Sequence, residues 1–101
     1  MHQKRNHHVA QLCNQARQAL EISLICDCDD PELQDLQILV VEQAPRSSAL
    51  VVTCSSKARD LVEIERRLAR ASGIFRAAVA REITRKRVPS LRFRVVPELV
   101  E

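Results

Sequence analysis

The sequence predicts a small α+β domain with the element order α-β-β-α-α-β, in which a three-stranded sheet carries helices on one face. Three observations predict this class. Apolar residues recur at three- and four-residue spacing near the N-terminus, two β-branched runs flank a turn-like segment, and a strictly alternating stretch lies close to the C-terminus. The chain has 101 residues, 46% of them hydrophobic, which is enough for one core. We therefore expect a single domain over residues 1–101, with an ordered core from about residue 9 to 96.

The first helix is predicted from about Arg5 to Ile25, and its apolar stripe consists of Val9, Leu12, Cys13, Ala16, Leu20 and Leu24. The stretch ICDCDDPEL follows it. Because a residue before proline avoids the α region, Asp30-Pro31 stops this helix or lies beyond its end. Asp30 is suited to cap a short turn that begins at Pro31, since proline needs no N–H at that position.

Two strands are predicted at Leu36–Glu42 and Ala49–Ser55, because both runs are β-branched and the segment QAPRSS between them has turn chemistry. The pair should form a hairpin. Ser55 or Ser56 is then expected to cap a second helix, whose inward residues are Leu61, Ile64, Leu68 and Ala71.

A third helix is predicted from about Ile74 to Lys86, ended by Val88-Pro89, with an inward face of Phe75, Ala78, Val79 and Ile83. On such a helix Arg81 and Arg85 would share one face. The last strand is predicted at Leu91–Val95, and its alternation places Arg92 and Arg94 outward and Leu91, Phe93 and Val95 inward.

The only glycine of the chain lies between the second and third helices, in Ala71-Ser72-Gly73. Ser-Gly is a known place for a sharp helix kink, and glycine is equally an ordinary C-cap between two packed helices. On either interpretation two helices meet at an angle at Gly73.

The ligand-type residues in ICDCDDPEL do not have the spacing of a metal site. A structural zinc site needs four ligands, normally in pairs, but Cys26 and Cys28 are one residue apart and no second pair exists. A calcium loop would need glycine and glutamate where the chain has Glu32 and Ile38. We therefore expect this stretch to be a turn, and we expect no metal or other cofactor.

Catalysis is not expected either. All three histidines lie within the first eight residues, where chain ends fray, so no cysteine or serine has a histidine base on an ordered element. A single glycine cannot build a phosphate-binding loop. We expect no catalytic residue, no enzymatic activity and no small-molecule substrate.

No apolar run approaches the roughly 20 residues of a membrane span, and the N-terminus lacks the apolar stretch of a signal peptide. We therefore expect a cytoplasmic protein that does not bind membranes. The four cysteines should be reduced thiols, and Cys13 and Cys54 fall on apolar positions typical of a core.

Charge is divided unevenly along the chain. Residues 21–45 contain seven acidic residues and no Lys or Arg, whereas residues 57–94 contain twelve basic and four acidic residues, a difference of +8. A basic half favours a polyanionic partner such as nucleic acid, although a solvated basic surface without a partner has the same composition.

Two further partner classes fit parts of the pattern. The helices on either side of Gly73 could form a helix-turn-helix of a DNA-binding regulator, but the segment FRAAVAREITRKR offers few side chains that read base edges. Alternatively, the chain could be a protein adaptor that contacts its partner through the acidic segment, residues 21–45.

The segment from Ala71 to Phe93, ASGIFRAAVAREITRKRVPSLRF, resembles the signature region of ribosome-binding factor A, a bacterial small-subunit assembly factor. Ala71-Ser72-Gly73 matches the Ala-x-Gly kink of that family and Arg76 matches the arginine after it. The family's basic stretch ends in a pattern of Arg, Pro, Leu and Phe, which Arg87, Pro89, Leu91 and Phe93 match in RVPSLRF. Asp30-Pro31-Glu32-Leu33 matches the turn after the family's first helix. The chain departs from the family at Val96-Pro97, where an aspartate is common, in its short hairpin, and in its lack of a C-terminal tail.

The resemblance implies a KH-like (type II-related) fold and binding to the small (30S) ribosomal subunit and its 16S rRNA during late maturation, with release before translation. The residues themselves indicate RNA binding without base stacking, because only Phe75 and Phe93 are aromatic and both are predicted inward. Phosphates of folded RNA would instead be held by cations on the third helix and on the strand beside it. We expect these to be Arg76, Arg81, Arg85, Lys86, Arg87 and Arg92, on a chain that is a monomer.

Overall fold

The computed structural model describes residues 2–83 and 87–99, with side chains from His8 onward. The elements are α1 (His2–Cys26), α2 (Pro31–Gln34), β1 (Gln37–Gln43), β2 (Leu50–Ser56), α3 (Leu61–Arg70), α4 (Ser72–Glu82) and β3 (Leu91–Pro97). This confirms the predicted order, with one short helix, α2, added after the first. In the described part of the chain, no helix is both long and apolar enough to cross a membrane.

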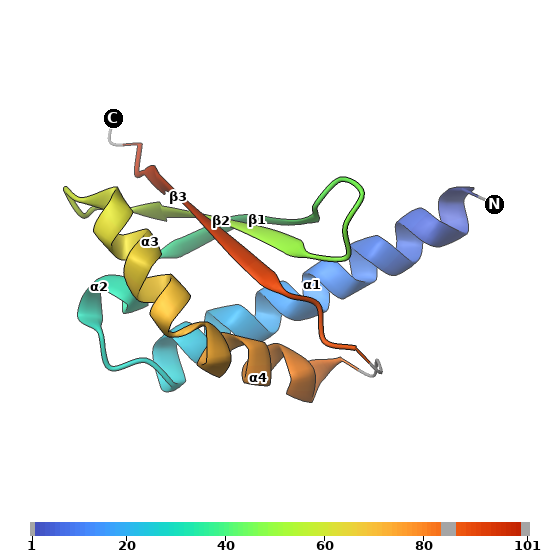
Figure 1. Ribbon diagram of the computed structural model, residues 1–101, viewed down its shortest axis with the longest axis horizontal. Helices are drawn as coiled ribbons and strands as arrows, with labels where there is room; N and C mark the ends of the chain where they lie inside the picture. Colours follow the sequence, from blue (N-terminus) through green and yellow to red (C-terminus); the bar gives the residue numbers. More distant parts are fainter. Residues whose placement is uncertain (1, 84–86, 100–101) are drawn as a thin grey trace.

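The three strands form one mixed sheet in the order β1-β2-β3 (Figure 1). β1 and β2 form the predicted antiparallel hairpin, in which Gln43 pairs with Leu50, and a bulge lies between Ile38 and Val40. β3 runs parallel to β2, with Leu91 opposite Leu50. Because parallel neighbours need a crossover connection, α3 and α4 provide the link between β2 and β3.

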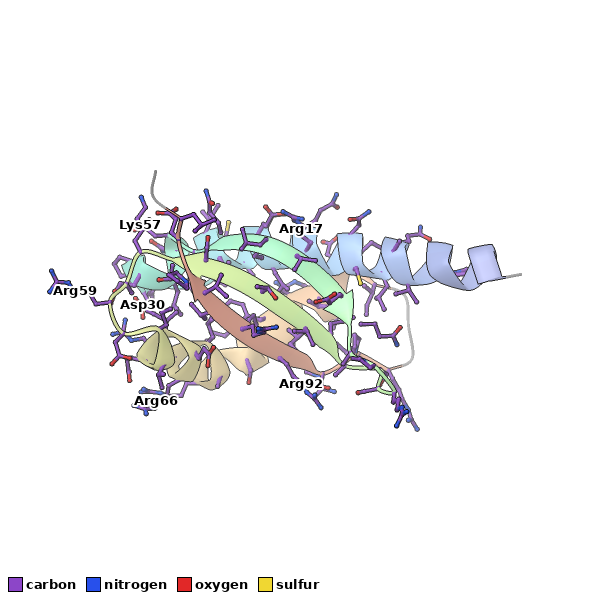
Figure 2. All side chains as sticks on the ribbon, turned by 90° about the horizontal axis from the view of Figure 1, so that it is seen from above. Arg17, Asp30, Lys57, Arg59, Arg66 and Arg92 are labelled. Atoms are coloured by element: carbon purple, nitrogen blue, oxygen red, sulfur yellow. The ribbon has the colours of Figure 1, made fainter. Side chains whose placement is uncertain are left out.

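The helices lie on one face of the sheet, as predicted. α1 packs against β1 and α4, and α3 packs against β3, so that the strands stand in front of the helices when the molecule is seen from above (Figure 2). The core between the two layers is almost entirely aliphatic, and its most deeply buried side chains include Leu20, Leu50, Val52, Ile64, Leu68, Phe75 and Val79. The opposite face of the sheet, which we call the open face, carries no helix among the described residues.

Both outer edges of the sheet are contacted by a helix side chain. On β1, Arg17 of α1 donates from Nη2 to the carbonyl oxygen of Ile38 at 2.8 Å and from Nη1 to that of Leu39 at 3.5 Å, beside the bulge. On β3, the N–H of Val95 donates to Oε1 of Glu65 on α3 at 3.0 Å. These contacts occupy backbone groups that an edge strand otherwise offers to another chain.

The predicted cap of the second helix is wrong. Ser55 and Ser56 are the last residues of β2 and are buried, and the N-cap of α3 is Asp60, whose Oδ1 accepts from the N–H of Glu63 at 3.1 Å. Ser56 Oγ instead accepts from the N–H of Ala58 at 3.0 Å, in the turn that leaves the strand. The error arose because serine favours caps and turns alike, so its presence did not fix which one follows the strand.

The predicted end of the third helix is also wrong. α4 ends at Glu82, and Ile83 has φ −110° and ψ 145°, which is extended backbone. Ile83 is buried in the core, and a β-branched residue gains little from continuing a helix. The chain therefore leaves α4 at Ile83, well ahead of Pro89.

The inward faces were predicted correctly. Phe75, Ala78, Val79 and Ile83 are all buried, as are Ile64 and Leu68 of α3. On β3, Val95 is buried, Leu91 and Phe93 are partly buried, and Arg92 and Arg94 are exposed. Strand boundaries lie within two residues of the prediction, and α1 begins three residues earlier and ends one residue later.

Candidate nucleic-acid interface

Two helices meet at a bend, as predicted, but the break lies at Ala71 and not at Ser72-Gly73, which are the first two residues of α4. Ala71 has φ −90° and ψ 6°, and it is both the C-cap of α3 and the N-cap of α4. Gly73 lies in the first turn of α4 with a negative φ, and a Cβ added there would meet nothing within 4 Å. The bend therefore depends on Ala71, and the local geometry does not require glycine.

The two predicted cations on α4 point to different neighbours. Arg76 donates from Nη2 to the carbonyl oxygen of Val88 at 3.4 Å, toward the segment that leads into β3. Arg81 Nη2 lies 3.5 Å from Oδ2 of Asp27, at the C-terminal end of α1. The structure therefore does not gather these two side chains at one point.

The remaining predicted cations follow α4. Arg87 is exposed in the segment before β3, and Arg92 is exposed on the open face of the sheet. Arg85 and Lys86 lie outside the described residues. The interface predicted from the sequence therefore extends from α4 around to the sheet.

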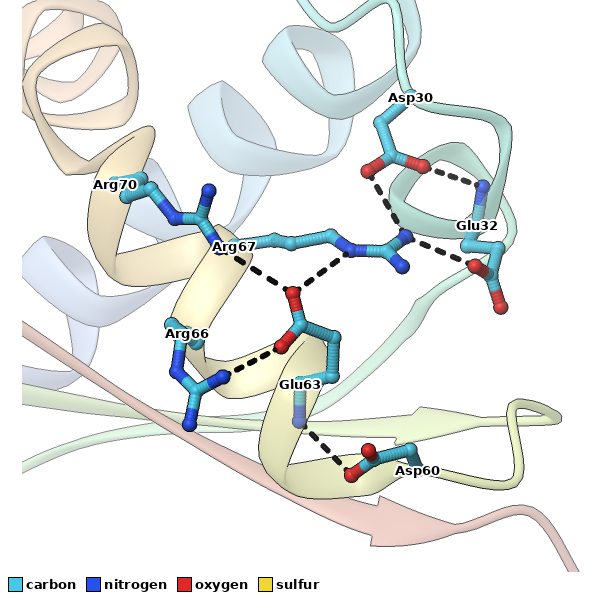
Figure 3. A network of polar contacts seen from close by, with 7 residues as sticks. All are labelled: Asp30, Glu32, Asp60, Glu63, Arg66, Arg67 and Arg70. Atoms are coloured by element: carbon cyan, nitrogen blue, oxygen red, sulfur yellow. Dashed lines mark hydrogen bonds and ion pairs between the residues drawn. The ribbon is translucent and has the colours of Figure 1, made fainter.

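Arginines of α3 belong to an ion-pair network that also holds α2 (Figure 3). Arg67 Nη1 lies 2.8 Å from Oε1 of Glu32 and 3.2 Å from Oδ2 of Asp30, and its Nε lies 3.6 Å from Oε1 of Glu63. The hydrogen bond to Glu32 is the main reason that the pKa of Arg67 is raised. Glu63 also pairs with Arg66 at 2.8 Å and with Arg70 at 3.3 Å. One carboxylate thus contacts three arginines, and Arg67 links α3 to α2 through Asp30 and Glu32.

The first half of the network starts from the stretch ICDCDDPEL. Asp30 caps α2 by accepting from the N–H of Glu32 at 3.0 Å, and Pro31 is the first residue of that helix. Leu33 is buried beneath it. The interpretation of this stretch as a capped turn is therefore confirmed.

The two cysteines of the same stretch differ in environment. Cys26 is exposed, whereas Cys28 is buried in the core. Burial, together with the nearby carboxylates of Asp30, Asp27 and Asp29, raises the pKa of the Cys28 thiol, which keeps it protonated at neutral pH. Elsewhere in the core, burial raises the pKa of Cys54 to about 12. Both thiols are therefore protonated at neutral pH, as expected for cysteines that pack as small apolar side chains.

Both phenylalanines contribute to packing. Phe75 is fully buried, and its ring lies 5.5 Å from that of Phe93 in an edge-to-face arrangement. Neither ring is presented as a platform on which a base could stack. Any nucleic acid would therefore be held through its backbone.

The comparisons with known proteins decide the family. The crystal structure of ribosome-binding factor A from Thermus thermophilus matches with a TM-score of 0.71 and 31% sequence identity, over 88% of this chain and 94% of that one. The chain belongs to the ribosome-binding factor A family. A homology model of the Thermus thermophilus ribosome-binding factor A, as fitted into a cryo-electron microscopy map of a 30S complex, matches with a TM-score of 0.65 and 28% identity over 83% of this chain and 88% of that one.

A third structure, described as that of a putative ribosome binding factor A, supports the fold alone. This solution NMR structure of a Thermotoga maritima protein matches with a TM-score of 0.69 and 24% identity, over 83% of this chain and 82% of that one. No protein-family model and no curated protein sequence matches the chain. The family assignment therefore rests on the match to the crystal structure, in which fold and sequence identity agree.

Two exposed cations near Arg92 were not assigned to the interface by sequence reasoning. Arg46 lies in the hairpin loop with φ 58°, and Arg94 follows Arg92 on the open face. Neither forms an ion pair or side-chain hydrogen bond with another described residue. The alternation of LRFRV indicated that Arg94 faces outward, but nothing in the sequence alone indicated that the hairpin loop lies beside the start of β3.

Proposed function

We propose that this chain is a ribosome biogenesis factor that binds the small ribosomal subunit and its 16S rRNA during late maturation and leaves before translation. One observation carries the proposal: the chain matches a ribosome-binding factor A at 31% identity over most of both chains, and a protein of that name has been fitted into a 30S complex. On this proposal the fold is a KH-like variant, the protein acts by binding and without catalysis, and it works in the cytoplasm.

The charge distribution supports an RNA partner. The exposed arginines of α4, of the segment before β3 and of β3 can contact phosphates without reading bases. Phe75 is buried and Phe93 is partly buried against it, so neither ring is an open stacking platform. We propose that phosphate contacts come from the six predicted cations, Arg76, Arg81, Arg85, Lys86, Arg87 and Arg92. A monomer is favoured by the contacts of Arg17 and Glu65 on the two sheet edges.

Co-sedimentation with purified ribosomal subunits tests the proposal. The protein should pellet with small subunits and not with large subunits, and binding should weaken steeply as salt is raised, because phosphate contacts release counterions. Equal recovery with both subunits would indicate only general attraction to RNA. Preferential binding to duplex DNA of the same length as an RNA control would instead favour a DNA-binding regulator.

A further inference from the structure

We propose that the open face of the sheet, at the end next to the β1–β2 hairpin, is itself an RNA-phosphate contact surface, which we call the hairpin-end patch. It consists of Arg46, Arg87, Arg92 and Arg94. The inference rests on the proposed function and adds Arg46 and Arg94 to it. It also moves the centre of the interface from α4 to the sheet.

The backbone brings these residues together from three segments. The N–H of Leu50 donates to the carbonyl oxygen of Ser90 at 2.9 Å, so the hairpin and the segment before β3 lie side by side. Arg46 is four residues from Leu50 and Arg87 is three residues from Ser90, which places them within about 14 Å and about 11 Å of that contact. Arg92 begins the exposed row of β3 beside the same contact.

Arg92 and Arg94 point to the same side of the strand. Their register partners on β2 are Val51 and Thr53, which alternate with the buried Leu50, Val52 and Cys54. Two residues along a strand are roughly 7 Å apart on one face, so the two guanidinium groups form a short cationic row. In Figure 2, Arg92 lies at the hairpin end of the sheet, whereas Lys57 and Arg59 lie at the opposite end.

None of the four arginines is held by a carboxylate of the described residues. By contrast, each of the α3 arginines pairs with Glu63, and Arg81 pairs with Asp27. Two carboxylates lie near this row: Glu65, whose Oε1 accepts from the N–H of Val95 next to Arg94, and Glu42, which is opposite Val51 and so lies two strands from Arg92. Neither forms an ion pair with an arginine of the patch. Unpaired, exposed guanidinium groups need not break an existing ion pair to contact a phosphate, and arginine can bind a phosphate through two N–H groups at once.

The end of the open face away from the hairpin differs in charge from the hairpin-end patch. At the far end lies a groove of about 500 Å³, whose lining contains no arginine or lysine and includes Leu39, Ser55, Val96, Pro97, Glu98 and Leu99. Cationic character on this face is therefore concentrated at the hairpin end. A polyanion is the partner that such a concentration of unpaired positive charge fits.

The test compares two variants that each lose three positive charges. The patch variant is Arg46→Gln/Arg92→Gln/Arg94→Gln, and the control is Lys57→Gln/Arg59→Gln/Arg66→Gln at the other end of the molecule. Binding to small subunits and to protein-free 16S rRNA is measured across a salt series. The patch variant should lose about tenfold or more in affinity, and the slope of log affinity against log salt should shrink by roughly three units. The control should change the affinity by less than about threefold, although its net charge is the same.

The outcomes separate the two proposals. If wild type binds small subunits but both variants lose affinity equally, the hairpin-end patch is wrong and the proposed function stands. If wild type does not bind small subunits, the proposed function fails, and the patch is judged on protein-free rRNA by the same comparison. If the patch variant weakens binding to subunits but not to protein-free rRNA, the surface contacts a protein and the inference is overturned. If the triple variant does not fold, Arg46→Gln is compared with Arg59→Gln, since each loses one charge in a loop outside every strand.

Discussion

The α2–α3 end and the hairpin end of the molecule both carry clustered arginines, but only at the α2–α3 end do these arginines pair with carboxylates. On α3, Arg66, Arg67 and Arg70 all contact Glu63, and Arg67 also reaches Asp30 and Glu32. At the hairpin end, four arginines have no carboxylate partner among the described residues. Exposed ion pairs contribute little to stability, but they hold a guanidinium group in place and compete with a phosphate for it. The local excess of +8 between residues 57 and 94 is therefore not spread evenly over the surface.

The largest loss of stability at the α2–α3 end is expected from removing Asp30. Asp30→Ala deletes the N-cap of α2, which is typically worth about 1 kcal/mol, and also removes one partner of Arg67. Urea denaturation should show a loss of about 1–2 kcal/mol, because the capping and ion-pair contributions are lost together. Binding to small subunits should be unchanged, since this end lies away from the patch.

Asp30→Asn is the matched control for this prediction. Asparagine is as good an N-cap as aspartate but carries no charge, so this variant should lose less stability than Asp30→Ala. Asp60→Ala, which deletes only the cap of α3, should cost about 1 kcal/mol. If Asp30→Asn were as unstable as Asp30→Ala, the ion pair and not the cap would be the main contribution.

A second prediction compares a paired with an unpaired arginine. Arg92→Gln should lower the affinity for small subunits by about three- to tenfold, whereas Arg81→Gln should lower it by no more than about twofold, because Arg81 already contacts Asp27. Both residues are exposed, so neither variant should unfold. Filter binding at two salt concentrations measures the difference. Equal losses of affinity would contradict the prediction, because Arg81 on α4 and Arg92 on the sheet would then contribute equally to binding.

A third prediction concerns a variant in which arginines at the α2–α3 end lose their shared carboxylate. Glu63→Gln removes the carboxylate shared by Arg66, Arg67 and Arg70, so the affinity for protein-free rRNA should rise by roughly two- to fivefold with a steeper salt slope. Glu21→Gln is the control, because it removes the same charge but leaves Arg17 held by the carbonyl of Ile38. If Glu21→Gln raised the affinity equally, net charge alone would explain the effect.

Much of the fold could be predicted because the local signals agreed with one another. Apolar spacing, β-branched runs and the capped Asp30-Pro31 turn all lie where expected, and the inward residues of α4 and β3 are buried or partly buried. The errors occurred where one residue type suits two structures. Serine at positions 55 and 56 fits a strand end or a cap, and Ile83 fits a helix or an extended core segment.

The site was harder to predict, because it depends on contacts between distant segments. Sequence reasoning placed Arg81 and Arg85 on one helix face, but α4 ends at Glu82. The arginines on and beside α3 also differ from one another, which the sequence did not indicate. Arg59 precedes that helix and pairs with no carboxylate of the described residues, whereas Arg67 belongs to the network that joins α3 to α2. Pairing across 35 or more residues of sequence cannot be read from composition.

The last prediction concerns the junction between the two ends, at Gly73. Since φ is negative there and a Cβ would meet nothing within 4 Å, Gly73→Ala should stabilise the protein by about 0.5 kcal/mol by restricting the unfolded chain and favouring the first turn of α4. Thermal or urea denaturation measures this, with Ser72→Ala as the control in the same turn. A loss of stability would mean that the bend does need glycine. A gain in stability combined with weaker binding to small subunits would show that the open space at Gly73 serves a close approach of the RNA backbone, and so would extend the interface from the hairpin end toward the α3–α4 bend.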